Sequence, residues 1–149
     1  MTQSVNQFGI TSEVGSDALA VNSNVITCRI DPASVATDIV SGQAVVLVDT
    51  ASTEILVDKA AAATDAIVGF VKHNPVENNP QKGALVEVML DNSFMRMEAS
   101  AAIARGATLQ ITTDRKVVTQ TTGTKIGVCL DKAAASGALV RVMIKTPIL

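Results

Sequence analysis

The chain has 149 residues, of which 48% are hydrophobic but only 2% aromatic, and its 12 basic and 14 acidic residues give a net charge of −2. This length is enough for one domain that buries its core without disulfides or metals. The charges are interspersed and form no basic run that could neutralise phosphates, and no window approaches the roughly 20 apolar residues of a membrane span, so we expect neither a nucleic-acid nor a membrane partner.

Residues 1–24 are small and polar, and their scattered apolar residues follow neither a helical nor a strand period. Two interpretations are open: a frayed terminus, or an extended arm that orders only on a partner. In the second, Phe8 is the expected anchor, with Ile10 and Val14 as further contact residues. The first residues lack the basic start and apolar run of a signal peptide, so we expect no secretion by that route.

From residue 25 onwards, short β-branched runs alternate with glycine, proline and asparagine turns, which is typical of strands. A glycine at position 69 interrupts one run and indicates a bulge or tight bend. The loop over residues 73–82 contains two prolines and three asparagines and is expected to be exposed. The predicted strands cover residues 25–30, 43–49, 54–57, 66–72, 84–90, 93–97, 108–113, 116–120, 125–130 and 138–145.

Three alanine-rich pieces could be helical. Residues 33–40 could form one or two helical turns, and residues 59–65 predict a loop with a helical turn because isolated helices of this length are marginal. Residues 98–105 are the best helix candidate, stopped by Gly106.

An internal repeat organises the chain. Residues 83–90 read Gly-Ala-Leu-Val-Glu-Val-Met-Leu, and residues 137–144 read Gly-Ala-Leu-Val-Arg-Val-Met-Ile, with six of eight positions identical. Further anchors precede the octapeptides in the same order in both copies, and the offset between matching glycines shrinks from 64 to 54 residues along the chain, as expected when the second copy has shorter loops. These anchors pair Gly42 with Gly106, Asp49 with Asp114 and Gly69 with Gly127.

These patterns predict an all-β fold, a compact β-sandwich or small barrel built from two pseudo-repeated four-strand units at about residues 31–90 and 97–145. One or two short helical turns and an extended N-terminal arm over residues 1–24 would complete it, with residues 25–149 as a single β-rich domain. A mixed α+β domain is the alternative, because the alanine-rich pieces could be longer helices.

No catalytic constellation is visible. The only histidine, His73, lies in the proline and asparagine loop without an evident partner, and no second histidine or paired cysteine supports a metal site. Cys28 and Cys129 lie in apolar strand-like runs and are expected to be buried thiols made in a reducing compartment. Phosphate-binding glycine motifs are absent. We therefore expect no enzyme activity, no catalytic residue, no cofactor and no metal.

About the last two-thirds of the chain resembles the capsid cement, or decoration, proteins of tailed bacteriophages. The resemblance lies in Ala-Ser-Ala-Ala-Ile-Ala-Arg-Gly-Ala-Thr-Leu-Gln-Ile at residues 99–111, Lys-Ile-Gly-Val-Cys-Leu at residues 125–130, and the octapeptide at residues 137–144. It implies a β-rich structural protein, made in the host cytoplasm, that binds the outer surface of the phage head, bridges neighbouring major capsid proteins and stabilises the shell. It further implies a homo-oligomer, a dimer or a trimer, on local symmetry axes of the capsid.

The alternative function is a surface adhesin or glycan-binding head domain of the virion, although the scarcity of aromatic residues argues against it. Ordinary core packing is the alternative reading of the contact residues, and we favour it for Met95 and Met97. The residues predicted to contact the capsid or another subunit are Phe8, Ile10, Val14, His73, Asn74, Asn78, Phe94, Met95 and Met97.

Overall fold

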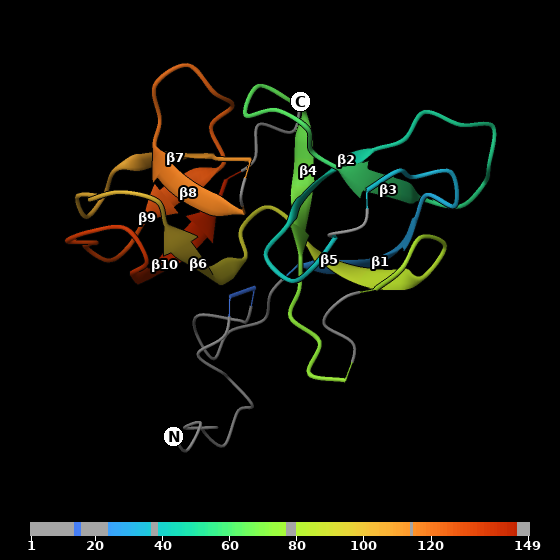
Figure 1. The fold of residues 1–149 in the computed structure, drawn as a ribbon, viewed down its shortest axis with the longest axis horizontal. Helices are drawn as coiled ribbons and strands as arrows, with labels where there is room; N and C mark the ends of the chain where they lie inside the picture. The colour runs from blue at the N-terminus through green and yellow to red at the C-terminus, as the bar shows by residue number, and fades with distance from the viewer. Residues whose placement is uncertain (1–13, 16–23, 37–38, 77–79, 114, 146–149) are drawn as a thin grey trace.

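The computed structural model describes residues 14–15, 24–36, 39–76, 80–113 and 115–145. These residues contain no helix, so the predicted all-β class is confirmed. Figure 1 shows the strands as two groups that lie side by side, one from each half of the chain. The ten strands are β1 (Val25–Ile30), β2 (Ala44–Leu47), β3 (Leu56–Lys59), β4 (Ile67–Val71), β5 (Leu85–Met89), β6 (Phe94–Ala99), β7 (Thr108–Ile111), β8 (Lys116–Thr119), β9 (Gly127–Cys129) and β10 (Leu139–Ile144).

Each group is a closed five-stranded barrel. Barrel 1 has the order β1-β3-β2-β4-β5 and barrel 2 the order β6-β8-β7-β9-β10, and each closes by pairing its first strand with its last. In both barrels the first strand is parallel to the third, and every other pair is antiparallel. The predicted units of four strands are therefore units of five, because the strands expected at residues 25–30 and 93–97 belong inside the repeats.

The repeat seen in the sequence is present in the backbone geometry. The two octapeptides form β5 and β10, which occupy equivalent places in the two barrels. Gly42 and Gly106 both have a φ of 81°, a left-handed conformation that favours glycine. Gly42 N donates to Val71 O at 2.8 Å, and Gly106 N donates to Cys129 O at 2.7 Å. The two halves therefore share pairing order, turn conformation and hydrogen bonds.

The helix expected at residues 98–105 is wrong. Glu98 and Ala99 are the last residues of β6, and Ile103 forms a two-way backbone bridge with Ala133, with N–O distances of 2.9 and 3.0 Å. Pairing with a distant segment overrides the local helix propensity of the alanines. Within the predicted segment 59–65, Lys59 ends β3 and the residues after it form a turn, in which the Asp65 carboxylate accepts hydrogen bonds from the backbone N–H groups of residues 61 and 62.

The core of barrel 2 extends to the outer wall of barrel 1. The interior of barrel 1 forms one cluster of its own, around residues such as Val45, Val57 and Val88. The interior of barrel 2 forms a larger cluster that also includes side chains from the outer wall of barrel 1. These wall residues are all buried: Ala44, Ala60, Ile67, Phe70 and Met89.

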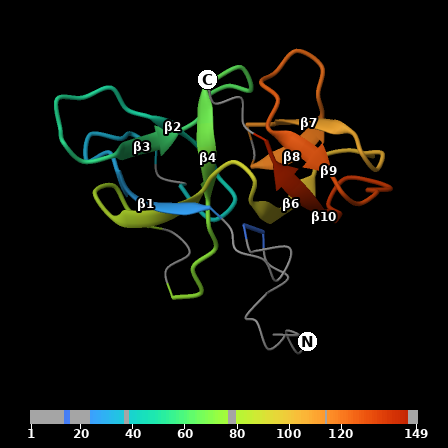
Figure 2. The same cartoon turned by 180° about the vertical axis from the view of Figure 1, so that it is seen from behind.

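Part of the predicted N-terminal arm is attached to both barrels. Gly15 N donates to the carbonyl of Arg96 in β6 at 2.8 Å, and Gly15 O accepts from the N–H of His73, just after β4, at 2.9 Å. The Val14 side chain lies so close to Gly42 that a Cβ added there would come within 2.5 Å of Val14 Cγ1. This dipeptide is drawn in dark blue between the two barrels in Figure 2.

Candidate functional site

Exposed apolar side chains gather on barrel 1. Six large hydrophobic residues are exposed among those that the structure describes, and only Leu139 belongs to barrel 2. Leu47 and Ile55 line the same groove, and exposed apolar side chains that lie together in this way mark interaction sites. The five on barrel 1 and its loops are Val35, Leu47, Ile55, Val76 and Leu85.

One part of this surface is a groove at one end of barrel 1, which we call the open end. Its volume is about 330 Å³. Every strand of the barrel contributes an apolar residue to it, or, for β5, the residue directly after the strand. These residues are Ile26, Leu47, Leu56, Val68 and Leu90, and the β2–β3 loop adds Thr50, Ser52, Glu54 and Ile55.

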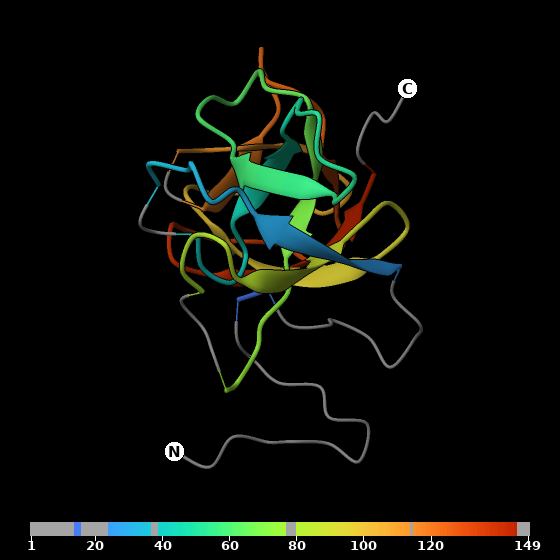
Figure 3. The ribbon, with the colours of Figure 1, turned by 90° about the vertical axis from the view of Figure 1, so that its right-hand side faces the viewer.

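A second groove, of about 740 Å³, adjoins the open end. The two share Leu47, Val48 and Val68, and the second continues past the β3–β4 loop to Thr124 of barrel 2. Its polar lining includes Asp58, Lys59, Thr64 and Asp65. Figure 3 looks onto barrel 1 from the side opposite barrel 2 and shows how its strands wrap around one another. Barrel 1 therefore offers a broad, mainly apolar surface.

The predicted contact residues are spread over several environments. Met95 and Met97 point into barrel 2 and are fully buried, which is the core-packing alternative, and they leave no surface for a partner. Phe94, on the same strand, is half-buried. Phe8, Ile10 and Asn78 lie outside the described residues.

The loop after β4 carries two more of these residues. His73 is half-buried and uses its backbone N–H to hold Gly15. Asn74 is exposed, and its side-chain oxygen accepts from Val76 N at 2.9 Å, which shapes the loop. Sequence reasoning missed Leu47 because the apolar run at residues 43–49 indicated a strand buried on both faces. It missed Ile55 because this residue was assigned to the strand predicted at residues 54–57, whereas it lies in the loop before β3.

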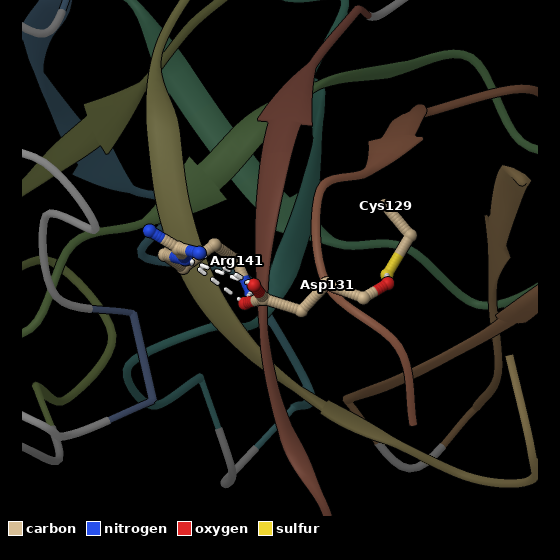
Figure 4. Close-up of polar contacts among 3 residues, drawn as sticks. All are labelled: Cys129, Asp131 and Arg141. Atoms are coloured by element: carbon tan, nitrogen blue, oxygen red, sulfur yellow. Dashed lines mark hydrogen bonds and ion pairs between the residues drawn. The ribbon is translucent and has the colours of Figure 1, made fainter. Parts of the chain in front are cut away.

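A hydrogen-bonded ion pair closes one loop of barrel 2 (Figure 4). Arg141, in β10, donates its backbone N–H, Nε and Nη2 to the Asp131 carboxylate, with the Nη2 contact at 2.6 Å. These side-chain hydrogen bonds lower the pKa of Asp131 below its ordinary value. Cys129 Sγ donates to the Asp131 carbonyl at 3.2 Å, and burial raises the pKa of this thiol. A thiol with a raised pKa is a poor nucleophile, which argues against a chemical role for Cys129. The hydrogen bonds of this cluster instead hold the loop at Asp131 against β10.

In the part of the chain that the structure describes, no group of three or more His, Cys, Asp or Glu side chains could hold a metal ion. None of the described residues belongs to a helix long and apolar enough to cross a membrane.

Comparisons with known proteins agree with the fold. A family model described as phage cement protein matches residues 25–144, from the first residue of β1 to the last of β10. A solved structure, the N base of the head fiber gp8.5 of bacteriophage phi29, is similar with a TM-score of 0.57 and 18% identity, over 86% of this chain and 98% of that one, which shows a shared fold. No curated protein matches. Because the family match spans both barrels, the chain belongs to the phage cement protein family and is a structural protein of the phage head.

Proposed function

We propose that this protein binds the outer surface of the phage head, bridges neighbouring major capsid proteins and stabilises the shell without enzymatic activity. The observation that carries the proposal is the family match over all ten strands. The apolar surface of barrel 1 supports it, since a cement needs an adhesive face on a rigid body. In this reading the protein is a homo-oligomer, a dimer or a trimer, on local symmetry axes of the capsid.

The symmetry of a capsid allows such a protein to bind tightly through weak individual contacts. A shell presents the same site many times, so an oligomer that engages several sites at once binds far more tightly than one subunit does. Each single interface can then be modest. The net charge of −2 suits a protein that sits beside many copies of itself, because strong like charge would oppose close packing.

The N-terminal residues are proposed to act as an arm. Gly15 is fixed where the two barrels meet, so the residues before it start from a defined point on the molecule. Phe8 and Ile10 would anchor the arm on a neighbouring protein, in the manner of an extended peptide added to a sheet edge. Removal of residues 1–13 keeps Gly15 and is expected to weaken head binding without unfolding the barrels. Unchanged affinity for heads would refute the arm.

The glycan-binding alternative gains no support from the aromatic residues. Phe70 is fully buried and Phe94 is half-buried, so the described part of the chain offers no exposed aromatic ring on which a sugar could stack.

The direct test uses heads assembled without this protein. Purified protein added to such heads is expected to bind to saturation and to raise the temperature at which the heads release their DNA. Tail-only particles are the matched control and should bind none. Absence of binding to heads, or binding that leaves their stability unchanged, would contradict the bridging role.

A further inference from the structure

The open end of barrel 1 has a counterpart in barrel 2, and there it is closed. The strand registers match Ile26 with Met95, Leu47 with Ile111, and Val68 with Ile126. In barrel 1 these side chains are half-buried or exposed, and Leu47 is 57% exposed, whereas every barrel 2 counterpart is at most 3% exposed. The last residues of the two octapeptides show the same difference, since Leu90 of barrel 1 is half-buried and Ile144 of barrel 2 is buried. The same end of one repeat is therefore covered and that of the other is not.

The cover on barrel 2 is the outer wall of barrel 1. Ala44, Phe70 and Met89 lie next to one another across β2, β4 and β5, face away from the interior of their own barrel, and belong to the core cluster of barrel 2. At the rim of this contact, Arg115 of barrel 2 donates from Nη1 to the carbonyl of Ser41 in barrel 1 at 3.0 Å. Within one chain, therefore, the end of barrel 2 packs against the outer wall of barrel 1.

Barrel 2 carries the equivalent wall, and the described part of the chain leaves it partly exposed. Thr108, Val128 and Met143 have the same register across β7, β9 and β10 as the covering residues have in barrel 1. All three are half-buried. Each chain therefore has one unused end on barrel 1 and one unused wall on barrel 2, which are the two halves of a head-to-tail contact.

The two surfaces carry exposed charges of opposite sign, Asp49 beside the open end and Lys125 on the wall of barrel 2. The rim of the open end carries Glu54, which pairs with Arg29, and the exposed Asp49 close by in the same loop. The wall of barrel 2 carries the exposed Lys125 at the position that Ile67 holds in barrel 1. This wall is more polar than its counterpart, so a contact made through it should be weaker than the one within the chain.

The relation between the barrels indicates a ring. The β3–β4 loop of barrel 1 touches the equivalent β8–β9 loop of barrel 2, where Thr124 N donates to Ala63 O at 2.7 Å. Equivalent points related by a rotation approach each other only near the rotation axis, and only when little translation accompanies the rotation. Repeating this step from chain to chain would therefore bring the barrels around a common axis, and they close into a ring when a whole number of steps completes one turn.

We propose that the open end of barrel 1 binds the outer wall of barrel 2 in a second copy of this chain, so that copies join head to tail into a closed ring. The ring would place the β3–β4 and β8–β9 loops near its axis. This inference rests on the homo-oligomer of the proposed function and specifies which surfaces of the subunits meet in it. It does not require binding to the capsid.

Site-directed cross-linking tests the register of this contact. The bond from Arg115 to Ser41 has as its intermolecular equivalent a pair formed by Ile55 and Arg105, since Ile55 corresponds to Arg115 and Arg105 to Ser41. A chain carrying both Ile55→Cys and Arg105→Cys is expected to give a ladder of covalent oligomers on oxidation at high protein concentration, ending at one closed species. Both positions are surface-exposed, so the substitutions should not impair folding.

The matched control carries Val76→Cys with Arg105→Cys, because Val76 is 93% exposed and lies outside the open end. It should give no ladder, and each single variant should give at most a dimer. Failure of the Ile55 and Arg105 pair to cross-link beyond the control would overturn the proposal. The native Cys28 and Cys129 are buried, so they should form no cross-links in the folded chain.

A second pair of variants separates this inference from the capsid role. Leu47→Lys, at the open end, is expected to lower the self-association constant at least ~10-fold in sedimentation velocity, whereas Leu85→Lys, which is equally exposed, should leave it unchanged. If Leu47→Lys abolishes head binding but leaves self-association intact, the open end is a capsid site and the ring contact is wrong. If self-association behaves as expected but no variant or parent binds heads, the proposed function fails and the ring contact stands.

Discussion

Gly69 and Gly127 occupy the same place in the two barrels, each pressed against the backbone of the neighbouring strand. A Cβ added to Gly69 would lie 2.3 Å from Met89 O, and one added to Gly127 would lie 2.2 Å from Met143 O. No real side chain tolerates such a distance to a backbone atom, so the last two strands of each barrel approach as closely as they do only because these residues are glycines.

Alanine at either of these glycines should destabilise the protein by about 2–4 kcal/mol, because the strands must separate to admit the methyl group. Gly83→Ala and Gly137→Ala are the controls: their surroundings are open, and only their φ values of 80° and 89° oppose the substitution. The controls should cost about 1–2 kcal/mol. Urea unfolding followed by circular dichroism measures all four, and equal losses would contradict the steric explanation.

The Asp131 and Arg141 pair should make stability depend on pH in acid. Hydrogen bonds from Arg141 lower the pKa of Asp131 in the folded chain, so the pair contributes fully above the unfolded pKa of about 3.9, and its contribution is lost as the pH falls through the folded pKa. Asp131→Asn should lower stability at pH 7 by about 1 kcal/mol, discounted because both side chains are partly solvated.

The measurement for this pair is the difference in unfolding free energy between the parent and Asp131→Asn as a function of pH. The difference should be constant near neutrality and shrink below about pH 4. Lys116 and Glu98, an ion pair with both side chains one-third exposed, provide the control, since Glu98→Gln should cost less. A difference that grows in acid would contradict the assignment.

Each barrel contains one buried cysteine, so thiol reactivity can show whether the two barrels unfold together. Cys28 lies inside barrel 1 and Cys129 inside barrel 2, and burial raises the pKa of both thiols. Neither should react with a thiol reagent in the folded chain. In increasing urea both should become reactive at the same midpoint, because the core cluster of barrel 2 includes the wall of barrel 1. Two separate midpoints would show that the barrels unfold independently, against the predicted single domain.

Phe70 carries much of the contact between the barrels. It is fully buried and belongs to the wall of barrel 1 that covers barrel 2. Phe70→Ala should cost about 3–5 kcal/mol and should shift the reactivity of both cysteines together. Phe94→Ala, at a half-buried ring, should cost clearly less. If only the Cys28 midpoint moves with Phe70→Ala, the ring stabilises barrel 1 alone.

Much of the architecture can be predicted from the sequence because the repeat includes glycines at positions where the backbone conformation or a close contact requires glycine. Gly42 and Gly106 are needed for a left-handed turn, and Gly69 and Gly127 for close strand contact, so the repeat kept them. The helix expected at residues 98–105 shows the limit of local reasoning, since the bridge between Ile103 and Ala133 depends on a residue thirty positions away.

The candidate surface could not be predicted in the same way. Leu47 and Ile111 are similar residues at the same position of the two repeats, yet one is exposed and the other buried. The difference arises from how the barrels pack on each other, and the sequence of either repeat alone contains no trace of it. Met95 and Met97 show the reverse case: core packing is the reading that the sequence favours for them, and both are fully buried.

The most direct test of the account is an electron-microscopy map of the intact phage head compared with a map of heads that lack this protein. The account predicts extra density on the outer surface, formed by pairs of small barrels around a local symmetry axis, with each copy touching at least two major capsid proteins. Density inside the shell, density confined to one capsid protein, or identical maps would contradict it.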